Sequence, residues 1–316
     1  MGPRQKTWIL AGISLMLIFV FLFTDLRGNI DYILTRRFYK VLAILLTGAA
    51  IGFSTVVFQT ITQNRILTPN IMGLDSLYVL IHTVIVFTFG SATLTAMDKN
   101  LQFLVLVALM IFFSGFLYKF LFKRGRQNLY FLLLIGFIAG TLFDSLSSVM
   151  QVLMDPNEFL IVQDRMFSSI NNINTDLVWL AFALFLLSTL YFLRYVKFLD
   201  VLALGRDMAV NLGVDFDHVV KRLLAIVAVL LSISTALVGP MTFLGLLVAN
   251  ISYEFYKTYM HRYLIAGAIF ISFIALAGGQ LVVERVYQFS TPISVIINFI
   301  GGVYFIYLLI RENRKW

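Results

Sequence analysis

Residues 40–60 read KVLAILLTGAAIGFSTVVFQT, and Lys40 is the only charged residue among them. An α-helix needs about 20 predominantly apolar residues to cross the hydrocarbon core of a bilayer. A helix can cross because it satisfies every backbone polar group within itself. The stretch therefore predicts a transmembrane helix.

Nine further apolar runs lie on either side of it, separated by polar breaks: 8–23, 74–91, 101–118, 129–153, 177–193, 219–238, 242–253, 263–283 and 292–310. The run at 242–253 is too short to cross alone and follows Gly239-Pro240. We expect a tilted or broken helix there, buried among the others. The pattern predicts an all-α polytopic membrane protein, with about ten transmembrane helices in one domain over residues 1–316.

The composition agrees with a membrane location. Hydrophobic residues make up 60% of the 316 residues, charged residues 13%, and the mean hydropathy is +0.92. Soluble domains average about 25% charged residues. The chain has no cysteine, which excludes disulfides, thiolate metal sites and cysteine nucleophiles. It also has no P-loop, HExxH or GxSxG motif, so we expect no catalytic or ATP-binding site within the chain.

The distribution of lysine and arginine predicts the topology. If the N-terminus is cytoplasmic and the helices alternate, 17 of the 24 basic residues lie inside and 7 outside. Cytoplasmic loops carry such an excess, so both termini are predicted to be cytoplasmic. The inner set is Arg4, Lys6, Arg65, Lys119, Lys123, Arg124, Arg126, Arg194, Lys197, Arg206, Lys221, Arg222, Lys257, Arg262, Arg311, Arg314 and Lys315; the outer set is Arg27, Arg36, Arg37, Lys40, Lys99, Arg165 and Arg285.

Two polar features between helices point to partners. Arg36, Arg37 and Lys40 form a basic cluster on the outer side, which suits either lipid headgroups at a helix end or an acidic extracellular partner. Residues 200–217, DVLALGRDMAVNLGVDFD, are interrupted by Gly205 and Gly213 and predict two short amphipathic helices across a glycine turn. We expect this segment to dock a soluble cytoplasmic protein.

An acid stands inside the fifth apolar run, at Asp144, with Ser145 and Ser148 beside it. A charged group within the bilayer is costly and needs a partner or a water-filled path. Two interpretations stay open: a hydrogen-bonded residue in helix packing, or a residue that lines a translocation pathway.

Several motifs together resemble a known family. They are 202–214 (LALGRDMAVNLGV) with Arg222, 239–247 (GPMTFLGLL), 300–309 (IGGVYFIYLL), and Gln59, Asn64, Pro69 and Gly73 in order. The chain resembles the FecCD-type permeases, the membrane subunits of binding-protein-dependent ABC importers for ferric siderophores, haem and cobalamin. The resemblance covers nearly the whole chain.

The resemblance implies a type II ABC importer fold in the bacterial cytoplasmic membrane. Its partners would be a second permease (a heterodimer, or else a homodimer), two ATP-binding subunits, a substrate-binding lipoprotein and a ferric siderophore as cargo. It implies no cofactor in this chain, since the partner ATPase uses ATP and Mg²⁺, and no covalent chemistry.

The resemblance also assigns roles to residues of this chain. The residues that match the ATPase-coupling motif are Gly205, Arg206, Asp207, Ala209, Leu212 and Gly213. Those that match binding-protein docking positions are Arg36, Arg37, Lys40 and Arg285. Those that match gate or pathway positions are Asn64, Ile66, Asp144, Ser145 and Ser148.

The chain departs from the family pattern at two places. Asn64-Arg65-Ile66-Leu67 replaces the usual Asn-Pro-Leu-Ala, and Ala249, Asn250 and Tyr253 stand where Pro-His-x-x-Arg is usual. The run 64–75 resembles the branch of second permease subunits in importers of catecholate siderophores, including petrobactin-type systems. The alternatives are the same machinery carrying cobalamin or haem, and an ion-coupled secondary transporter or intramembrane enzyme.

Overall fold

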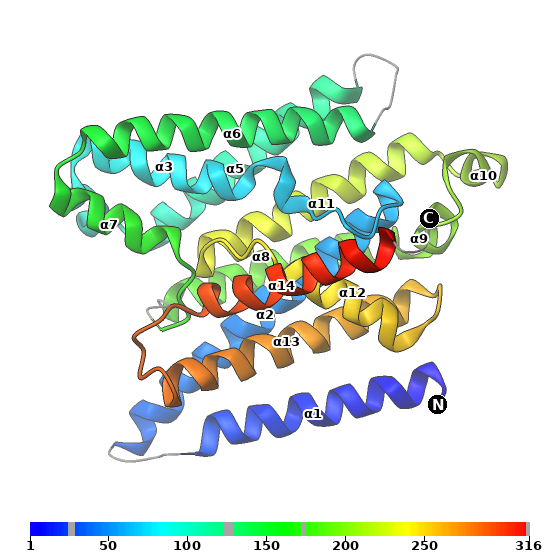
Figure 1. Ribbon diagram of the computed structural model, residues 1–316, viewed down its shortest axis with the longest axis horizontal. Coiled ribbons are helices and arrows are strands. Elements are labelled where there is room, and N and C mark those ends of the chain that lie inside the picture. Colours follow the sequence, from blue (N-terminus) through cyan, green and yellow to red (C-terminus); the bar gives the residue numbers. More distant parts are fainter. Residues whose placement is uncertain (25–28, 123–128, 172–174, 314–316) are drawn as a thin grey trace.

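The computed structural model describes residues 1–24, 29–122, 129–171 and 175–313, and within them every regular element is a helix (Figure 1). Ten helices match the ten predicted apolar runs. They are α1 (Pro3–Phe23), α2 (Ile30–Thr62), α3 (Leu74–Phe89), α5 (Lys99–Phe122), α6 (Leu129–Leu153), α8 (Thr175–Phe192), α11 (Phe216–Val238), α12 (Leu244–Tyr256), α13 (His261–Arg285) and α14 (Ile293–Asn313). In this part of the chain eight are long and apolar enough to cross a membrane; α3 and α12 are shorter. The predicted all-α polytopic fold is confirmed.

Helix α2, which contains the stretch 40–60, lies at the centre of the bundle. It packs against α11, α13, α12 and α8, and Val56, Val57 and Phe58 are fully buried. The helix begins ten residues before the predicted run, because Asn29 caps it by accepting a hydrogen bond from the Tyr32 amide at 3.4 Å. The residues added at this end include Arg36 and Arg37.

The short helix α12 follows a sharp turn. The chain leaves α11 at Gly239, whose φ is 102°, and Pro240 comes next. Proline cannot donate a backbone hydrogen bond, so α11 cannot continue through it. As expected for the run at 242–253, α12 has only 13 residues and is buried, against α13 and α2.

Close helix contacts hold α6 to the start of α3. The 3₁₀ turn η1 (Pro69–Met72) leads into α3, and it packs on two glycines of α6. A Cβ placed on Gly136 would lie 2.8 Å from the Met72 Cα, and one on Gly140 would lie 3.1 Å from the Gly73 Cα. Small residues permit such close approach of backbones within a membrane.

The two ends of the bundle differ. The N-terminus, the end of α14 and two short helices, α9 (Val196–Leu202) and α10 (Arg206–Asn211), gather at one end, on the right of Figure 1. The helix α7 (Pro156–Met166) and the chain after α13 lie at the other. We name these the α10 end and the α7 end. A short helix, α4 (Ser91–Ala96), links α3 to α5. Six basic residues used for the topology lie outside the described residues: Arg27, Lys123, Arg124, Arg126, Arg314 and Lys315.

Candidate functional site

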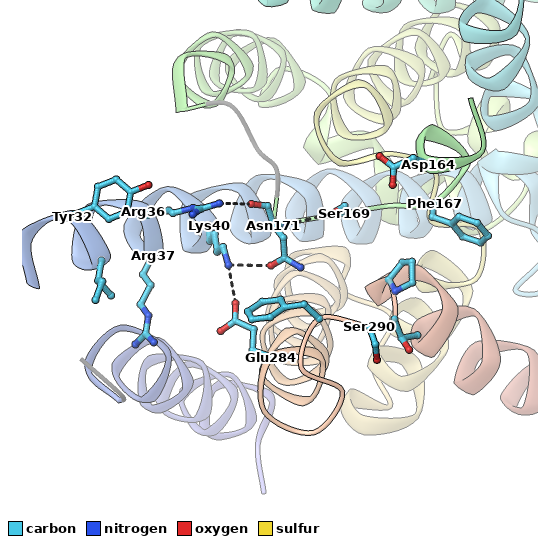
Figure 2. A pocket seen from close by; sticks show the side chains of 14 residues that line it. Tyr32, Arg36, Arg37, Lys40, Asp164, Phe167, Ser169, Asn171, Glu284 and Ser290 are labelled. Carbon is cyan, nitrogen blue, oxygen red and sulfur yellow. Dashed lines mark hydrogen bonds and ion pairs between the residues drawn. The ribbon is translucent and has the colours of Figure 1, made fainter. Parts of the chain in front are cut away.

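A cavity of about 700 Å³ opens at the α7 end, and Figure 2 shows its lining. Three of the four predicted docking residues, Arg36, Arg37 and Lys40, line it from α2. Two acids, Asp164 and Glu284, line it as well. The cavity therefore carries charges of both signs, and the roles of the cations depend on their partners.

Lys40 is bound within the chain. Its Nζ lies 2.9 Å from Glu284 Oε1 and 3.0 Å from Asn171 Oδ1, as the dashed lines in Figure 2 mark. The Gln280 amide donates to the same two oxygens, at 3.0 Å and 2.7 Å. The Lys40 and Glu284 side chains are only 12% and 15% exposed. This polar cluster joins α2 and α13, at the α7 end of the bundle, to the segment before α8.

The three arginines differ in their surroundings. Arg37 is half-buried and donates to the carbonyls of Phe21, Leu22 and Thr24, which end α1. Cations at a helix C-terminus satisfy its last carbonyls and oppose the helix dipole. Arg36 is exposed and donates to the Asn171 carbonyl at 3.3 Å. Arg285 is exposed at the end of α13 and donates to the Thr24 hydroxyl. Arg36 and Arg285 are thus exposed, although each guanidinium group donates one hydrogen bond within the chain.

The segment predicted to couple to an ATPase forms two short helices, α9 and α10, as expected. Gly205, between them, has φ 97°, and Gly213, after α10, has φ 81°. Residues with a Cβ rarely adopt a positive φ, so glycine is favoured at both turns. Ala209 is fully buried, whereas four apolar side chains of the segment are more than half exposed: Leu204, Met208, Val210 and Leu212.

Charges flank that apolar surface. The Arg206 guanidinium lies 3.7 Å from the Asp217 carboxylate, and both side chains are about half exposed, at 53% and 46%. Asp207 is in the first turn of α10. An apolar patch with a charged rim is typical of a protein-binding surface.

A second cavity, of about 540 Å³, opens at the α10 end. Ile66 and Arg65 line it from the loop after α2, with Asn250 and Tyr253 from α12. Asn64 does not line it; its Oδ1 accepts a hydrogen bond from the Ile66 amide at 2.8 Å and so shapes the turn.

The two departures from the family pattern meet in this cavity. The Arg65 guanidinium lies 4.7 Å from the centre of the Tyr253 ring, a cation–π distance. The Asn250 amide donates to the Arg65 carbonyl at 3.0 Å. Both changes therefore belong to one local arrangement, in which the replaced residues contact each other.

The predicted pathway residues lie on an exposed face of α6. Asp144, Ser145 and Ser148 are all exposed, and Thr141 extends the same face by one turn. The hydroxyls of Ser145 and Ser148 donate to the carbonyls four residues earlier, at 2.7 Å and 2.8 Å. A polar stripe on a spanning helix is unfavourable against lipid, so this face suits a wet surface or a protein partner.

Two polar arrangements were not predicted from the sequence. One is the cluster of Glu284, Gln280 and Asn171 around Lys40. The other is His261, whose ring lies between Asp200 and Thr60. Helical spacing signals only the Gln280–Glu284 pair, four residues apart on α13; the other partners are distant in sequence.

Known proteins resemble the chain over all or most of its length. It is 62% identical over 316 residues to the petrobactin import system permease protein YclO of Bacillus subtilis (strain 168), and the match covers all of both chains. It is 37% identical over 281 residues to the petrobactin import system permease protein FatC of Bacillus anthracis, covering 89% of this chain and 79% of that one.

A solved structure has the same fold. It is described as an inward-facing conformation of a metal-chelate type ABC transporter, and it superposes with a TM-score of 0.83 over 98% of this chain and 99% of that one, at 21% sequence identity. The model of the FecCD transport family matches residues 7–311. The ten-helix fold, the paired short helices at one end and this match agree, and the chain belongs to the FecCD transport family.

Proposed function

We propose that this chain is one permease subunit of a binding-protein-dependent ABC importer that carries a ferric siderophore of the petrobactin class. The observation that carries the proposal is the 62% identity to a permease named for petrobactin import. The match covers the whole of both chains. The second relative has the same cargo in its name. The relative named for hemin transport, HmuU of Yersinia pestis, is only 25% identical, so petrobactin is favoured over haem.

Two surfaces of the chain suit the partners of such an importer. The apolar patch on and beside α10, with exposed Met208 and Leu212, would sit on an ATP-binding subunit, which hydrolyses ATP with Mg²⁺. At the α7 end, the exposed Arg36 and Arg285 would meet acidic residues of a substrate-binding lipoprotein. This assignment places the α10 end, with both termini, in the cytoplasm.

The pathway would form where this chain meets a second permease. The polar stripe of Asp144, Ser145 and Ser148 would face that partner across a water-filled path, because lipid contact is unfavourable for these groups. The loop with Asn64 and Ile66, beside the cavity at the α10 end, would close the path toward the cytoplasm. ATP-driven movement of the docked subunit would then change the side to which the path opens.

Transport with purified components tests the proposal. The chain is co-expressed with a permease, an ATPase and a binding protein from the same organism, and the purified complex is placed in proteoliposomes. We expect ATP-dependent uptake of ⁵⁵Fe-petrobactin, and faster ATP hydrolysis when the loaded binding protein is present. Uptake that needs only an ion gradient, or uptake of cobalamin or haem in place of petrobactin, would contradict it.

The coupling surface has its own variant. Replacing Met208 and Leu212 with Asp puts charge into the apolar patch without touching the buried Ala209. We expect the ATPase to be lost from the purified complex while the permease still inserts. As a control, Leu187 and Leu190, two exposed residues of α8, are replaced with Ala. We expect the ATPase to stay bound to this variant.

A further inference from the structure

A buried histidine connects three elements at the α10 end. His261, the first residue of α13, is 4% exposed. Its Nδ1 lies 2.6 Å from Asp200 Oδ1, and its Nε2 lies 2.8 Å from the Thr60 hydroxyl oxygen. The His261 backbone amide donates to the same Asp200 oxygen at 2.9 Å. One imidazole therefore joins α9, α13 and α2.

The two sides of the ring are chemically distinct. Asp200 Oδ1 already accepts the backbone amide, and an ionised carboxylate has no proton to give, so Nδ1 donates to it. The Thr60 hydroxyl also lies 2.8 Å from the Val56 carbonyl, to which it can donate its single proton. Both ring nitrogens are thus engaged, and displacement of either partner would leave a buried polar group unpaired.

The contacts continue from Thr60 to the loop that follows α2. Gln59, the neighbour of Thr60, donates from its amide to the Arg65 carbonyl at 2.6 Å. The Asn64 backbone amide donates to the Gln59 carbonyl at 3.2 Å. Arg65 and Ile66 line the cavity at this end. An unbroken series of polar contacts and one peptide link therefore runs from α9 to this cavity.

A second contact runs in parallel. A Cβ placed on Gly205, between α9 and α10, would lie 3.0 Å from the Gln63 side-chain amide nitrogen. Gln63 is the C-cap of α2, the residue directly after Thr62. The coupling segment thus touches the end of α2 directly at Gln63 and holds it through His261 at Thr60.

We infer that His261 is a positioning residue that transmits displacement of α9 to residues 63–66, and that transport depends on its two-sided hydrogen bonding. The inference rests on the proposed function, in which α9 and α10 are moved by the ATPase. A ring that is hydrogen-bonded on both sides moves with its partners, because breaking either hydrogen bond leaves a buried ring nitrogen without a partner. ATP hydrolysis would then be linked to opening at Arg65 and Ile66 through this ring.

Variants of one side chain separate the two bonds. In His261→Asn the amide nitrogen overlies Nδ1 and keeps the bond to Asp200, while the bond to Thr60 is lost. In His261→Gln the amide overlies Nε2 and keeps Thr60, while Asp200 is lost. Thr60→Val removes the hydroxyl, and Thr60→Ser retains it. The matched control is His218→Gln, an exposed histidine in the first turn of α11.

The readout is the number of ⁵⁵Fe-petrobactin molecules imported per ATP hydrolysed by the complete importer in proteoliposomes. We expect His261→Asn, His261→Gln and Thr60→Val to lower this ratio about tenfold, with hydrolysis still stimulated by the loaded binding protein. Thr60→Ser and His218→Gln should match the wild type. A purely structural role of His261 in starting α13 would lower the yield of folded complex without changing the ratio.

A direct measurement of the loop keeps the test independent of transport. The chain has no cysteine, so Arg65→Cys supplies a single thiol at an exposed position of the loop. We expect its labelling rate by a membrane-impermeant maleimide to change when vanadate traps the nucleotide, and this change to vanish in the His261→Asn background. The same change in both backgrounds, together with a normal transport ratio, would overturn the inference. Loss of the ATPase from the wild-type complex would instead refute the proposed function.

Discussion

The ion pair between Lys40 and Glu284 is largely withdrawn from solvent at the α7 end, with 12% and 15% side-chain exposure. Replacing Lys40 with Met would leave the largely buried Glu284 carboxylate without its cation. Removing one partner of a buried pair is strongly destabilising, and we expect a loss of about 3 kcal/mol in the free energy of unfolding. We expect this loss to appear as a lower melting temperature, which is measured by heating the purified chain in detergent and following it by size-exclusion chromatography.

Two further variants serve as controls for Lys40→Met. The double variant Lys40→Met with Glu284→Gln removes both charges, and we expect it to recover much of the lost stability, since neither charge is then left alone. Arg36→Ala removes an exposed cation in the same cavity and should leave the melting temperature unchanged. Equal destabilisation by Arg36→Ala and Lys40→Met would contradict the distinction between a structural and an available cation.

The sequence indicated several candidate residues, but it did not indicate which side chains these residues contact. The sequence marked Lys40 as a basic residue at a helix start, but its partner Glu284 lies 244 positions later. Asp200 and His261 are 61 positions apart. Such contacts arise only when helices distant in sequence pack together, and no periodicity within one helix reports them. The departures at Arg65 and at Asn250 were visible in the sequence, whereas their mutual contact was not.

At the level of helices, the apolar runs predicted the elements well, because bilayer thickness fixes both length and composition. The predicted and observed bounds coincide for α6 at 129–153. They differ for α2, which extends to Ile30, since capping and helix propensity continue a helix past its apolar part. The helix α7 was not predicted, because it is short and lies outside the apolar runs that a bilayer selects.

The contact between α6 and η1 supplies a prediction about packing. A Cβ on Gly136 would stand 2.8 Å from the Met72 Cα, so Gly136→Val forces the two backbones apart. We expect a loss of about 1–3 kcal/mol, the usual cost of overpacking. Gly115→Val in α5 is the matched control, since a Cβ placed there would have no atom within 4 Å beyond the neighbouring backbone of its own helix. The melting temperatures of both variants in detergent test this prediction. An equal fall in the two melting temperatures would contradict it.

For the whole molecule, the arrangement of ends predicts which surfaces face which compartment. Because the chain lacks cysteine, single thiols can be placed without background: Leu212→Cys on the segment after α10, Leu160→Cys on α7, and Phe112→Cys in the middle of α5. Positive residues favour the cytoplasmic side, so a membrane-impermeant maleimide should label position 212 only in inside-out vesicles and position 160 only in intact cells. Position 112, on the surface of a spanning helix, should be protected by lipid in both. Labelling of 212 and 160 from the same side would contradict the topology, because α8 is the one candidate span among the described residues between these two positions and should place them on opposite sides.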